Sequence, residues 1–257
     1  MRNTVSRFSG FAGEYDAARP TPPAELVDLL AHYAGTSSPA VVDIGAGTGL
    51  STALWSGRAS ELVAVEPNPD MIAIARDRVP GCRFESGTAE DTGLASGSAD
   101  VVTASQAMHW FTAEPALREI ARVLRPGGVY AAFDCDWPPL VHPEVDAAYQ
   151  VLEHRQYALQ RERGLLPQRA DKREHLDRLR ESGRFTSTRE IALHSRESGD
   201  AQRLVDLVGT QSGVVALRRA GVSDREIGLE ALAEAAHRHL ATSRPWWWTY
   251  RVRIGVR

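Results

Sequence analysis

Three alternating glycines after a short apolar run are the residues of this chain with the clearest chemical meaning. The run Ala-Val-Val-Asp-Ile at 40–44 leads into Gly45, Gly47 and Gly49, and a helical pattern follows. This order predicts a strand, a tight turn and a helix N-terminus, an arrangement that binds ligands through its backbone. A dinucleotide-binding turn needs its third glycine five residues after the first, and Leu50 occupies that position. The spacing therefore argues against a nicotinamide oxidoreductase.

Acidic residues stand at the ends of the first two predicted strands. Asp43 precedes the glycine turn, and Glu66 ends the run Glu-Leu-Val-Ala-Val-Glu, 23 residues further on. That separation fits one strand–helix–strand step. Because ligands of open α/β sheets lie outside the carboxyl ends of the strands, both acids are expected at one site.

The alternating glycines with Asp43 before them resemble motif I of the class I S-adenosylmethionine methyltransferases. The resemblance implies that the glycine turn and Asp43 lie near the methionine part of S-adenosylmethionine. It also implies that Glu66 accepts both ribose hydroxyls, that residues 88–90 bind the adenine edge, and that an N-terminal element closes over the cofactor carboxylate. The cofactor-binding residues implied in this way are Tyr15, Arg19, Asp43, Gly45, Ala46, Gly47, Thr48, Glu66, Pro67, Met71, Thr88, Ala89, Glu90 and Gln106.

The stretch Gln-Ala-Met-His-Trp-Phe at 106–111 follows the fourth predicted strand and is expected to border the methyl group and its acceptor. It resembles the small-molecule branch of the family, which includes trans-aconitate-type and ubiquinone-biosynthesis-type methyltransferases. His109 is the candidate general base, because imidazole titrates near neutrality; ordering its own loop is the alternative role. The predicted acceptor-binding residues are His109, Trp110, Trp137, His142 and Trp247.

Three consecutive tryptophans near the end of the chain need a separate interpretation. Strand alternation places Trp246, Trp248 and Tyr250 on one face, which indicates core, and Trp247 on the other. Trp247 is therefore the one expected in a pocket or a subunit contact.

The rhythm of the apolar segments predicts the architecture. Strands are expected at 40–44, 61–66, 82–86, 100–104, 129–135, 185–194 and 246–256, and helices at 23–34, 48–57, 69–79, 113–124, 144–162, 170–182, 200–208 and 223–242. Their alternation predicts an α/β fold with a doubly wound, mostly parallel seven-stranded sheet of Rossmann-like type. Residues 1–135 are expected to form the cofactor-binding core with its closing element, 136–184 a helical acceptor-side lid, and 185–257 the remaining strands and helices of the same domain.

The composition limits the partners. The net charge of the 257 residues is −3, which gives no field that would attract nucleic acid, and no segment has the length of a membrane span. Cys82 and Cys135 fit no metal or redox pattern, so a reducing cytoplasm is expected and no metal is assigned. Ten basic against five acidic residues at 155–189 indicate either recognition of an anionic acceptor or a solvated helix face. The single lysine, Lys172, among many arginines is typical of a high-GC bacterial genome, for which secondary metabolism is an expected context.

These features together predict an S-adenosylmethionine-dependent methyltransferase acting on an O, N or C atom of a small molecule by in-line displacement, as a monomer or homodimer. The alternative is a protein of the same fold that binds S-adenosylmethionine without transferring its methyl group. A nucleic-acid methyltransferase is disfavoured, because Asp136-Trp-Pro-Pro follows strand five, not strand four, where an Asn/Asp-Pro-Pro-aromatic motif belongs. Asp134 and Asp136 are placed to bind Mg²⁺, but no third ligand is predicted.

Overall fold

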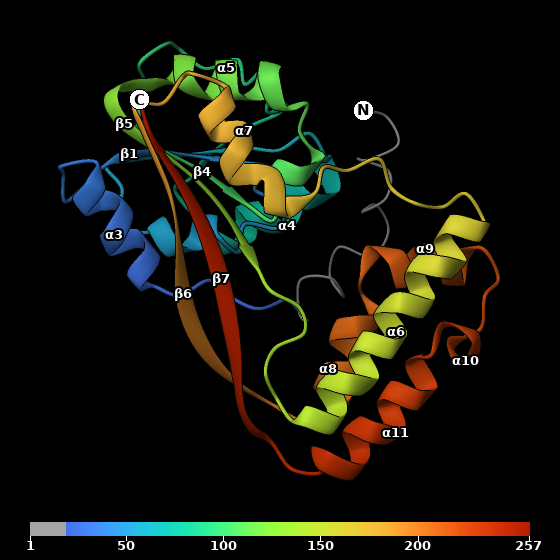
Figure 1. Cartoon of the computed structure of the whole chain (residues 1–257). Coiled ribbons are helices and arrows are strands. Elements are labelled where there is room, and N and C mark those ends of the chain that lie inside the picture. Colours follow the sequence, from blue (N-terminus) through green and yellow to red (C-terminus); the bar gives the residue numbers. More distant parts are fainter. Residues whose placement is uncertain (1–18) are drawn as a thin grey trace.

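The computed structural model describes residues 19–257, and a seven-stranded sheet runs through its centre (Figure 1). The strands lie in the order β3-β2-β1-β4-β5-β7-β6. Strand β7 pairs antiparallel with β5 and β6, and the other neighbours pair in parallel. The predicted mostly parallel, doubly wound sheet is therefore confirmed. The strands are β1 (Ala40–Ile44), β2 (Glu61–Val65), β3 (Arg83–Glu85), β4 (Ala99–Ser105), β5 (Leu124–Cys135), β6 (Ser187–Gly199) and β7 (Arg244–Val256).

The strand order reverses between β1 and β4. From β1 the chain continues outward to β2 and β3, whereas β4 and β5 lie on the other side of β1. The connections after β1 and β4 therefore leave in opposite directions, and a crevice is expected between them at the carboxyl ends of the strands. The glycine turn directly follows β1, and Glu66 directly follows β2.

Helices cover both faces of the sheet. Helix α3 (Glu25–Tyr33) and the 3₁₀ helix η2 (Thr52–Trp55) pack on one face, and α5 (Ala113–Val123) and α7 (His175–Glu181) pack on the other. Helix α4 (Pro69–Arg78) connects β2 with β3. Two further 3₁₀ turns are present: η3 (Met108–Trp110) follows β4, and η4 (Lys172–Glu174) precedes α7.

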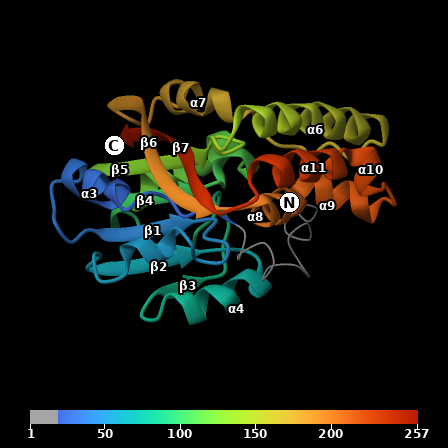
Figure 2. The same ribbon diagram turned by 90° about the horizontal axis from the view of Figure 1, so that it is seen from below.

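A second group of helices lies beyond the end of β5 and beside β7 (Figures 1 and 2). This helical group consists of α6 (Pro143–Glu162), α8 (Ala201–Gly209), α9 (Ser212–Arg219), α10 (Asp224–Ile227) and α11 (Leu229–His239). Within residues 19–257, no helix combines the length and the apolar character needed to cross a bilayer.

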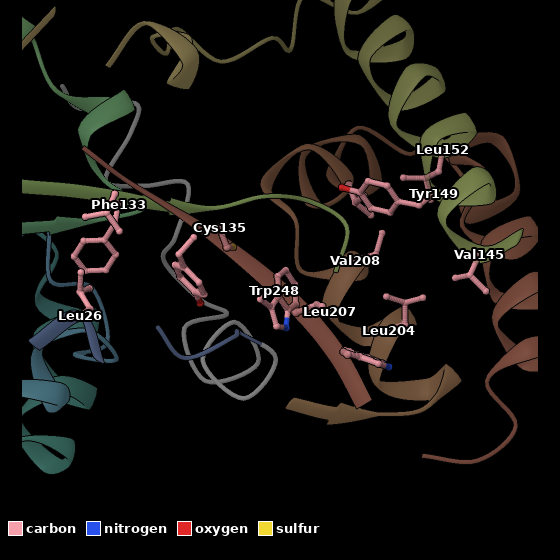
Figure 3. Packing of buried hydrophobic residues seen from close by; sticks show 14 of the residues in the cluster. Leu26, Phe133, Cys135, Val145, Tyr149, Leu152, Leu204, Leu207, Val208 and Trp248 are labelled. Carbon is pink, nitrogen blue, oxygen red and sulfur yellow. The ribbon is translucent and has the colours of Figure 1, made fainter. Parts of the chain in front are cut away.

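One continuous core joins the helical group to the sheet (Figure 3). Leu26 of α3 and Phe133 of β5 lie at its sheet end, and Leu152 and Leu204 lie inside the helical group, with Trp248 of β7 between the two ends. Burial of this apolar surface holds the helical group against the strand ends at which a ligand crevice is expected.

Some predicted helices are shorter or broken. The helix expected at 48–57 is reduced to η2, and Gly49 and Gly57, within the expected range, adopt positive φ, which a right-handed helix does not contain. The helix expected at 223–242 is interrupted at Gly228, whose φ of 96° is left-handed, so that α10 and α11 are separate. Helix α9 had no counterpart in the sequence prediction.

The segment predicted as a lid, 136–184, divides between two places. Helix α6 packs against α9 and α11, whereas α7 packs against β6 and β7. The other four helices of the helical group, α8 to α11, come from the connection between β6 and β7, which the sequence prediction assigned to the sheet-flanking region. The helical group is therefore built from two distant parts of the chain.

Candidate functional site

A cavity of about 230 Å³ opens at the carboxyl ends of β1, β2 and β4. The residues that the sequence prediction assigned to the site and that line it are Arg19, Gly45, Ala46, Gly47, Thr48, Glu66, Pro67, Met71, Thr88, Ala89, Glu90, Gln106 and Trp110. Tyr15 lies outside the described residues. The remaining assigned residues, Asp43, His109, Trp137, His142 and Trp247, are not part of the cavity wall formed by residues 19–257.

The glycine turn forms the floor of the cavity. Gly45 and Gly47 have φ values of 68° and 57°, which only glycine adopts at little cost. A Cβ at Gly45 would lie 2.7 Å from the Cβ of Ala107, so this glycine allows the turn to pack against the segment after β4. A Cβ at Gly47 would meet nothing within 4 Å. Since Gly47 also lines the cavity, the space at its α-carbon is open for a ligand.

Glu66 presents a fixed carboxylate to the same cavity. One oxygen accepts a hydrogen bond from the Gly47 amide at 3.0 Å, and the other accepts one from the Asn68 amide at 2.9 Å. Burial raises the pKa of Glu66, and these two amides oppose the rise. Each oxygen keeps a second lone pair, so the carboxylate can still accept hydroxyl groups of a ligand.

Asp43 lies beneath the turn, fully buried. Its carboxylate accepts hydrogen bonds from the hydroxyls of Ser51 at 2.8 Å, Thr52 at 2.6 Å and Thr103 at 2.7 Å. Burial raises its pKa, and the three hydroxyls oppose the rise. The expectation that Asp43 faces the methionine part of a ligand does not match this position; Asp43 instead ties the glycine turn to β4.

The segment after β3 closes another side of the cavity. The backbones of Thr88 and Asp91 exchange hydrogen bonds of 3.0 and 3.3 Å, which fix the tight loop between them. Glu90 accepts a hydrogen bond of 2.7 Å from the amide of Thr112, just before α5. Ala89 is buried, and Met71 faces the cavity from α4. This side therefore combines apolar surface with a polar edge.

Gln106 is the only non-glycine residue with positive φ among residues 19–257. Its amide nitrogen donates to Cys135 Sγ at 3.0 Å, and its amide oxygen accepts from Lys172 Nζ at 2.7 Å. Lys172 Nζ also lies 2.9 Å from Asp134 Oδ1. Sequence reasoning missed this role of Lys172, whose only signal was that it is the single lysine of the chain.

His109 points into a buried charged cluster. Its Nδ1 lies 3.6 Å from Asp134 Oδ1, and its ring stacks on His175 with 6.4 Å between centroids. Burial lowers the pKa of His109 to about 4 despite the nearby carboxylate. Burial alone would raise the pKa of Asp134, but His109 and Lys172 hold it below its usual range. In this position His109 does not line the cavity, so the structure does not place its ring where an acceptor was expected.

The aromatic candidates separate in the same way. Trp137 packs edge-on against Trp248 with 5.2 Å between centroids. His142 caps α6 and stacks on His239, and Trp247 is half exposed. The alternation predicted for the last strand is confirmed, since Trp246, Trp248 and Tyr250 are buried. Phe111, at the end of the stretch expected to border the methyl group and its acceptor, also lines the cavity. Residues on the cavity wall that sequence reasoning missed include Pro20, Pro22, Leu50, Ser51, Asn68, Cys135 and Tyr250.

No three His, Cys, Asp or Glu side chains within residues 19–257 come close enough to hold a metal ion. Asp134, one of the two acids placed after strand five, is paired with Lys172 and, at 3.3 Å, with Arg253. Asp136 accepts instead from Arg251 at 3.0 Å.

His175→Phe should reduce the loss of unfolding free energy that accompanies acidification from about pH 6.5 to pH 4. Neither ring nitrogen of His175 has a hydrogen-bond partner within the described part of the chain, and burial lowers its pKa to about 4. Because the unfolded imidazole has the ordinary pKa of 6.5, the unfolded chain takes up the proton first, and stability falls from about pH 6.5 to pH 4. Removing this imidazole should spare the chain a loss of about 3 kcal/mol at pH 4.

Urea unfolding of wild type and His175→Phe at several pH values between 7 and 4 measures this. The raised pKa values of Asp43 and Glu66 act in the opposite direction but are common to both proteins, so the difference isolates the imidazole. Parallel stability curves for the two proteins would contradict the prediction.

Comparison with known proteins identifies relatives of the cavity-forming half. Residues 42–132 match a methyltransferase domain family. An uncharacterized methyltransferase of Mycobacterium tuberculosis is 40% identical over 127 residues, which are 49% of this chain and 51% of the relative. The chain thus spans about half the length of the curated relatives it matches.

Solved structures extend the similarity to nearly the whole chain. A protein of Anaeromyxobacter dehalogenans, provisionally named a type II methyltransferase, is 30% identical with a TM-score of 0.72; the alignment covers 93% of this chain and 97% of the relative. A Bacillus subtilis protein at 20% identity and a TM-score of 0.54, with 91% and 99% covered, shares the fold.

Proposed function

Since the chain belongs to the class I S-adenosylmethionine-dependent methyltransferases, we propose that it methylates a small molecule bound beside the glycine turn. S-adenosylmethionine is the cofactor of this family, and its sulfonium supplies an activated methyl group for in-line displacement. The acceptor atom is an oxygen, nitrogen or carbon of the small molecule. The chain itself must bind both molecules, align them and exclude water.

The observation that carries this proposal is the convergence of three strand ends and the loop after β3 on one cavity. The open space at Gly47 leaves room for the amino-acid part of the cofactor. The fixed carboxylate of Glu66 suits the two ribose hydroxyls, because both of its oxygens retain acceptor capacity. Met71 and Ala89 suit the faces of the adenine, and Thr88 and Glu90 suit its polar edge. The residues present therefore fit the cofactor.

The acceptor end of the cavity is assigned to the wall formed by the segment after β4 and by residues of β5 and β7. Trp110, Phe111, Cys135 and Tyr250 line this wall, which suits a largely apolar acceptor. The guanidinium of Arg19 lies 5.4 Å from the Trp137 ring and donates to the Thr210 carbonyl at 3.2 Å, which places a positive charge near this end. A carboxylate or another anionic group on the acceptor would suit it.

Catalysis on this proposal depends on positioning. Holding the acceptor atom in line with an activated methyl group removes about 7–11 kcal/mol of the barrier in well-oriented reactions. Gln106, fixed from both sides by Cys135 and Lys172, orients the wall beside the reacting atoms. His109 is assigned a positioning role instead of the base role, because its carbonyl accepts the Ala170 amide at 2.9 Å and its ring faces Asp134.

Glu66→Gln is expected to weaken S-adenosylmethionine binding roughly tenfold to hundredfold, the loss typical of a charge-assisted hydrogen bond. Titration calorimetry of the variant and of wild type with S-adenosylmethionine measures the two dissociation constants. A separate titration with NADH tests that the cavity does not bind a nicotinamide cofactor. Glu85→Gln is the matched control, because Glu85 ends the neighbouring strand β3 but pairs with Arg83 outside the cavity. Equal affinity of Glu66→Gln and wild type would remove Glu66 from the cofactor site.

Methyl transfer itself is tested by release of S-adenosylhomocysteine in a panel of small apolar acids and their amine and phenol analogues. Turnover with any acceptor supports the proposal. Micromolar binding of the cofactor without turnover across the panel would favour a binding protein of the same fold, and folded protein that does not bind it would overturn the assignment.

A further inference from the structure

Within residues 19–257, strand β6 forms an unpaired edge of the sheet. It stands last in the strand order, and β7 is its only strand neighbour among residues 19–257. At 13 residues it is one of the two longest strands. The helical group α6 and α8–α11 lies on the β7 side, away from the outer edge of β6 (Figures 1 and 2). An edge of this length presents unpaired backbone groups that another strand can bind.

Side-chain burial along β6 decides which face of an added strand would continue the buried face of the sheet and which would continue the exposed face. Ile191 and Leu193 are partly buried against the core, while Ala192 and His194 are exposed on the opposite face. A strand added at this edge must keep the same alternation to remain in the sheet. When the partner is a second β6, this alternation is kept only in pairings that place odd-numbered residues of one strand opposite odd-numbered residues of the other.

The charged residues of β6 lie at equal distances on either side of Leu193, with opposite signs on the two sides. Arg189 and Glu197 lie four residues on either side of it, and Glu190 and Arg196 lie three residues on either side, with opposite signs at each distance. In an antiparallel pair of β6 strands centred on Leu193, every acid therefore faces a base of the other copy. Two-fold symmetry repeats each contact, so the pairing contains four ion pairs.

Other registers lose this match. Moving the centre to residue 192 or 194 leaves all four charges opposite uncharged or neutral residues. Centring the pair midway between residues 192 and 193 places Arg189 opposite Arg196, and centring it midway between 193 and 194 places Glu190 opposite Glu197. Like charges opposite each other destabilise a pair of strands. The sequence of β6 thus selects one self-pairing.

Contacts within the chain hold these side chains in place at the edge. Glu190 accepts from Arg253 Nε at 2.7 Å, and its side chain is 30% exposed. Glu197 accepts from the Thr21 amide at 2.9 Å and pairs with Arg203. Each carboxylate retains lone pairs for a further donor.

The basic partners are oriented in a similar way. Arg189 donates to the Tyr33 hydroxyl at 2.6 Å, and the Arg196 guanidinium lies 5.9 Å from the Trp247 ring. Both arginines are exposed and keep further N–H donors.

We propose that two copies of this chain associate through β6 in the antiparallel register centred on Leu193, which joins their sheets into one. The inference does not depend on the proposed function, because no residue of the cavity wall lies on β6.

Charge exchange tests the proposal. By sedimentation velocity at micromolar concentration, wild type is expected at twice the 28.1 kDa chain mass. Arg189→Glu alone and Glu197→Arg alone each place like charges opposite each other twice, and should raise the dissociation constant at least tenfold. An equal mixture of the two variants should restore the dimer, because every pair across the mixed interface is again of opposite sign.

Arg118→Glu is the matched control, because Arg118 lies on α5 and loses only an exposed ion pair with Glu114. Circular dichroism confirms that each variant is folded. A monomeric wild type, or an Arg189→Glu variant that remains as dimeric as wild type, would overturn the proposal.

A cysteine at the symmetry centre provides a test that is independent of charge. Opposite residues of antiparallel strands have Cα atoms about 4.5–5.5 Å apart, within the range of a disulfide. In a Cys82→Ser background, Leu193→Cys should therefore form a covalent dimer under mild oxidation. Thr188→Cys, whose copies would lie about 30 Å apart in this register, should not. Equal cross-linking of both variants, or none with Leu193→Cys, would contradict the register.

Discussion

Gly47→Val is expected to lower S-adenosylmethionine affinity at least a hundredfold while the chain still folds. A Cβ at this position meets nothing within 4 Å, and the residue lines the cavity, so the added isopropyl group occupies the ligand's space. The backbone cost is limited to placing a branched residue at a φ of 57°, about 1–3 kcal/mol. Titration calorimetry gives the affinity, and urea unfolding gives the stability.

Gly57→Val separates the two effects. Gly57 has a φ of 69°, is exposed, and would also meet nothing within 4 Å of an added Cβ, but it lies outside the cavity wall. Both variants should lose similar stability, and only Gly47→Val should lose affinity. Wild-type affinity in Gly47→Val would show that the cofactor does not bind over the glycine turn.

Asp43→Ala should cost about 3–5 kcal/mol of unfolding free energy, because it leaves three buried hydroxyls without their acceptor and a void in the core. Ser51, Thr52 and Thr103 all donate to this carboxylate, and together they join the turn to β4. Loss of cofactor affinity should follow from a disordered turn, not from a lost contact. Chemical unfolding and calorimetry on the same preparation measure both quantities.

Asp43→Asn distinguishes anchoring from direct contact. The amide keeps the size and one acceptor oxygen, so we expect a smaller loss of stability and affinity that falls in parallel with it. Intact stability with a large loss of affinity would instead indicate that Asp43 touches the cofactor.

The sheet was predictable because its signals are local. Each buried strand is a short apolar run, and the alternation of Trp246, Trp247 and Trp248 was enough to assign inner and outer faces of β7. The break at Gly228 was less visible, since alanine-rich sequence on both sides favours a helix and only the backbone conformation shows the interruption.

The sequence was sufficient to predict which segments form the site, but not which side chains face the cavity or which distant residues contact them. Strand ends mark where a ligand can bind, and most residues assigned there line the cavity. Sequence position does not reveal which of two neighbours faces inward: Trp110 reaches the cavity, whereas adjacent His109 faces Asp134. Lys172 was missed for another reason, because it reaches Gln106 from 66 residues further along the chain and only tertiary structure brings the two together.

We expect the hydrogen bond from Lys172 to Gln106 to link the binding of the proposed cofactor and acceptor thermodynamically. Lys172 lies in the connection from α6 to α7, and Gln106 forms part of the wall shared by both proposed ligands. An acceptor that shifts this connection must change cofactor affinity, and the cofactor must change acceptor affinity by the same factor. We therefore expect variants of the connection from α6 to α7 that are selected for a new acceptor to show altered cofactor affinity as well, so screening them at a single cofactor concentration would confuse the two effects.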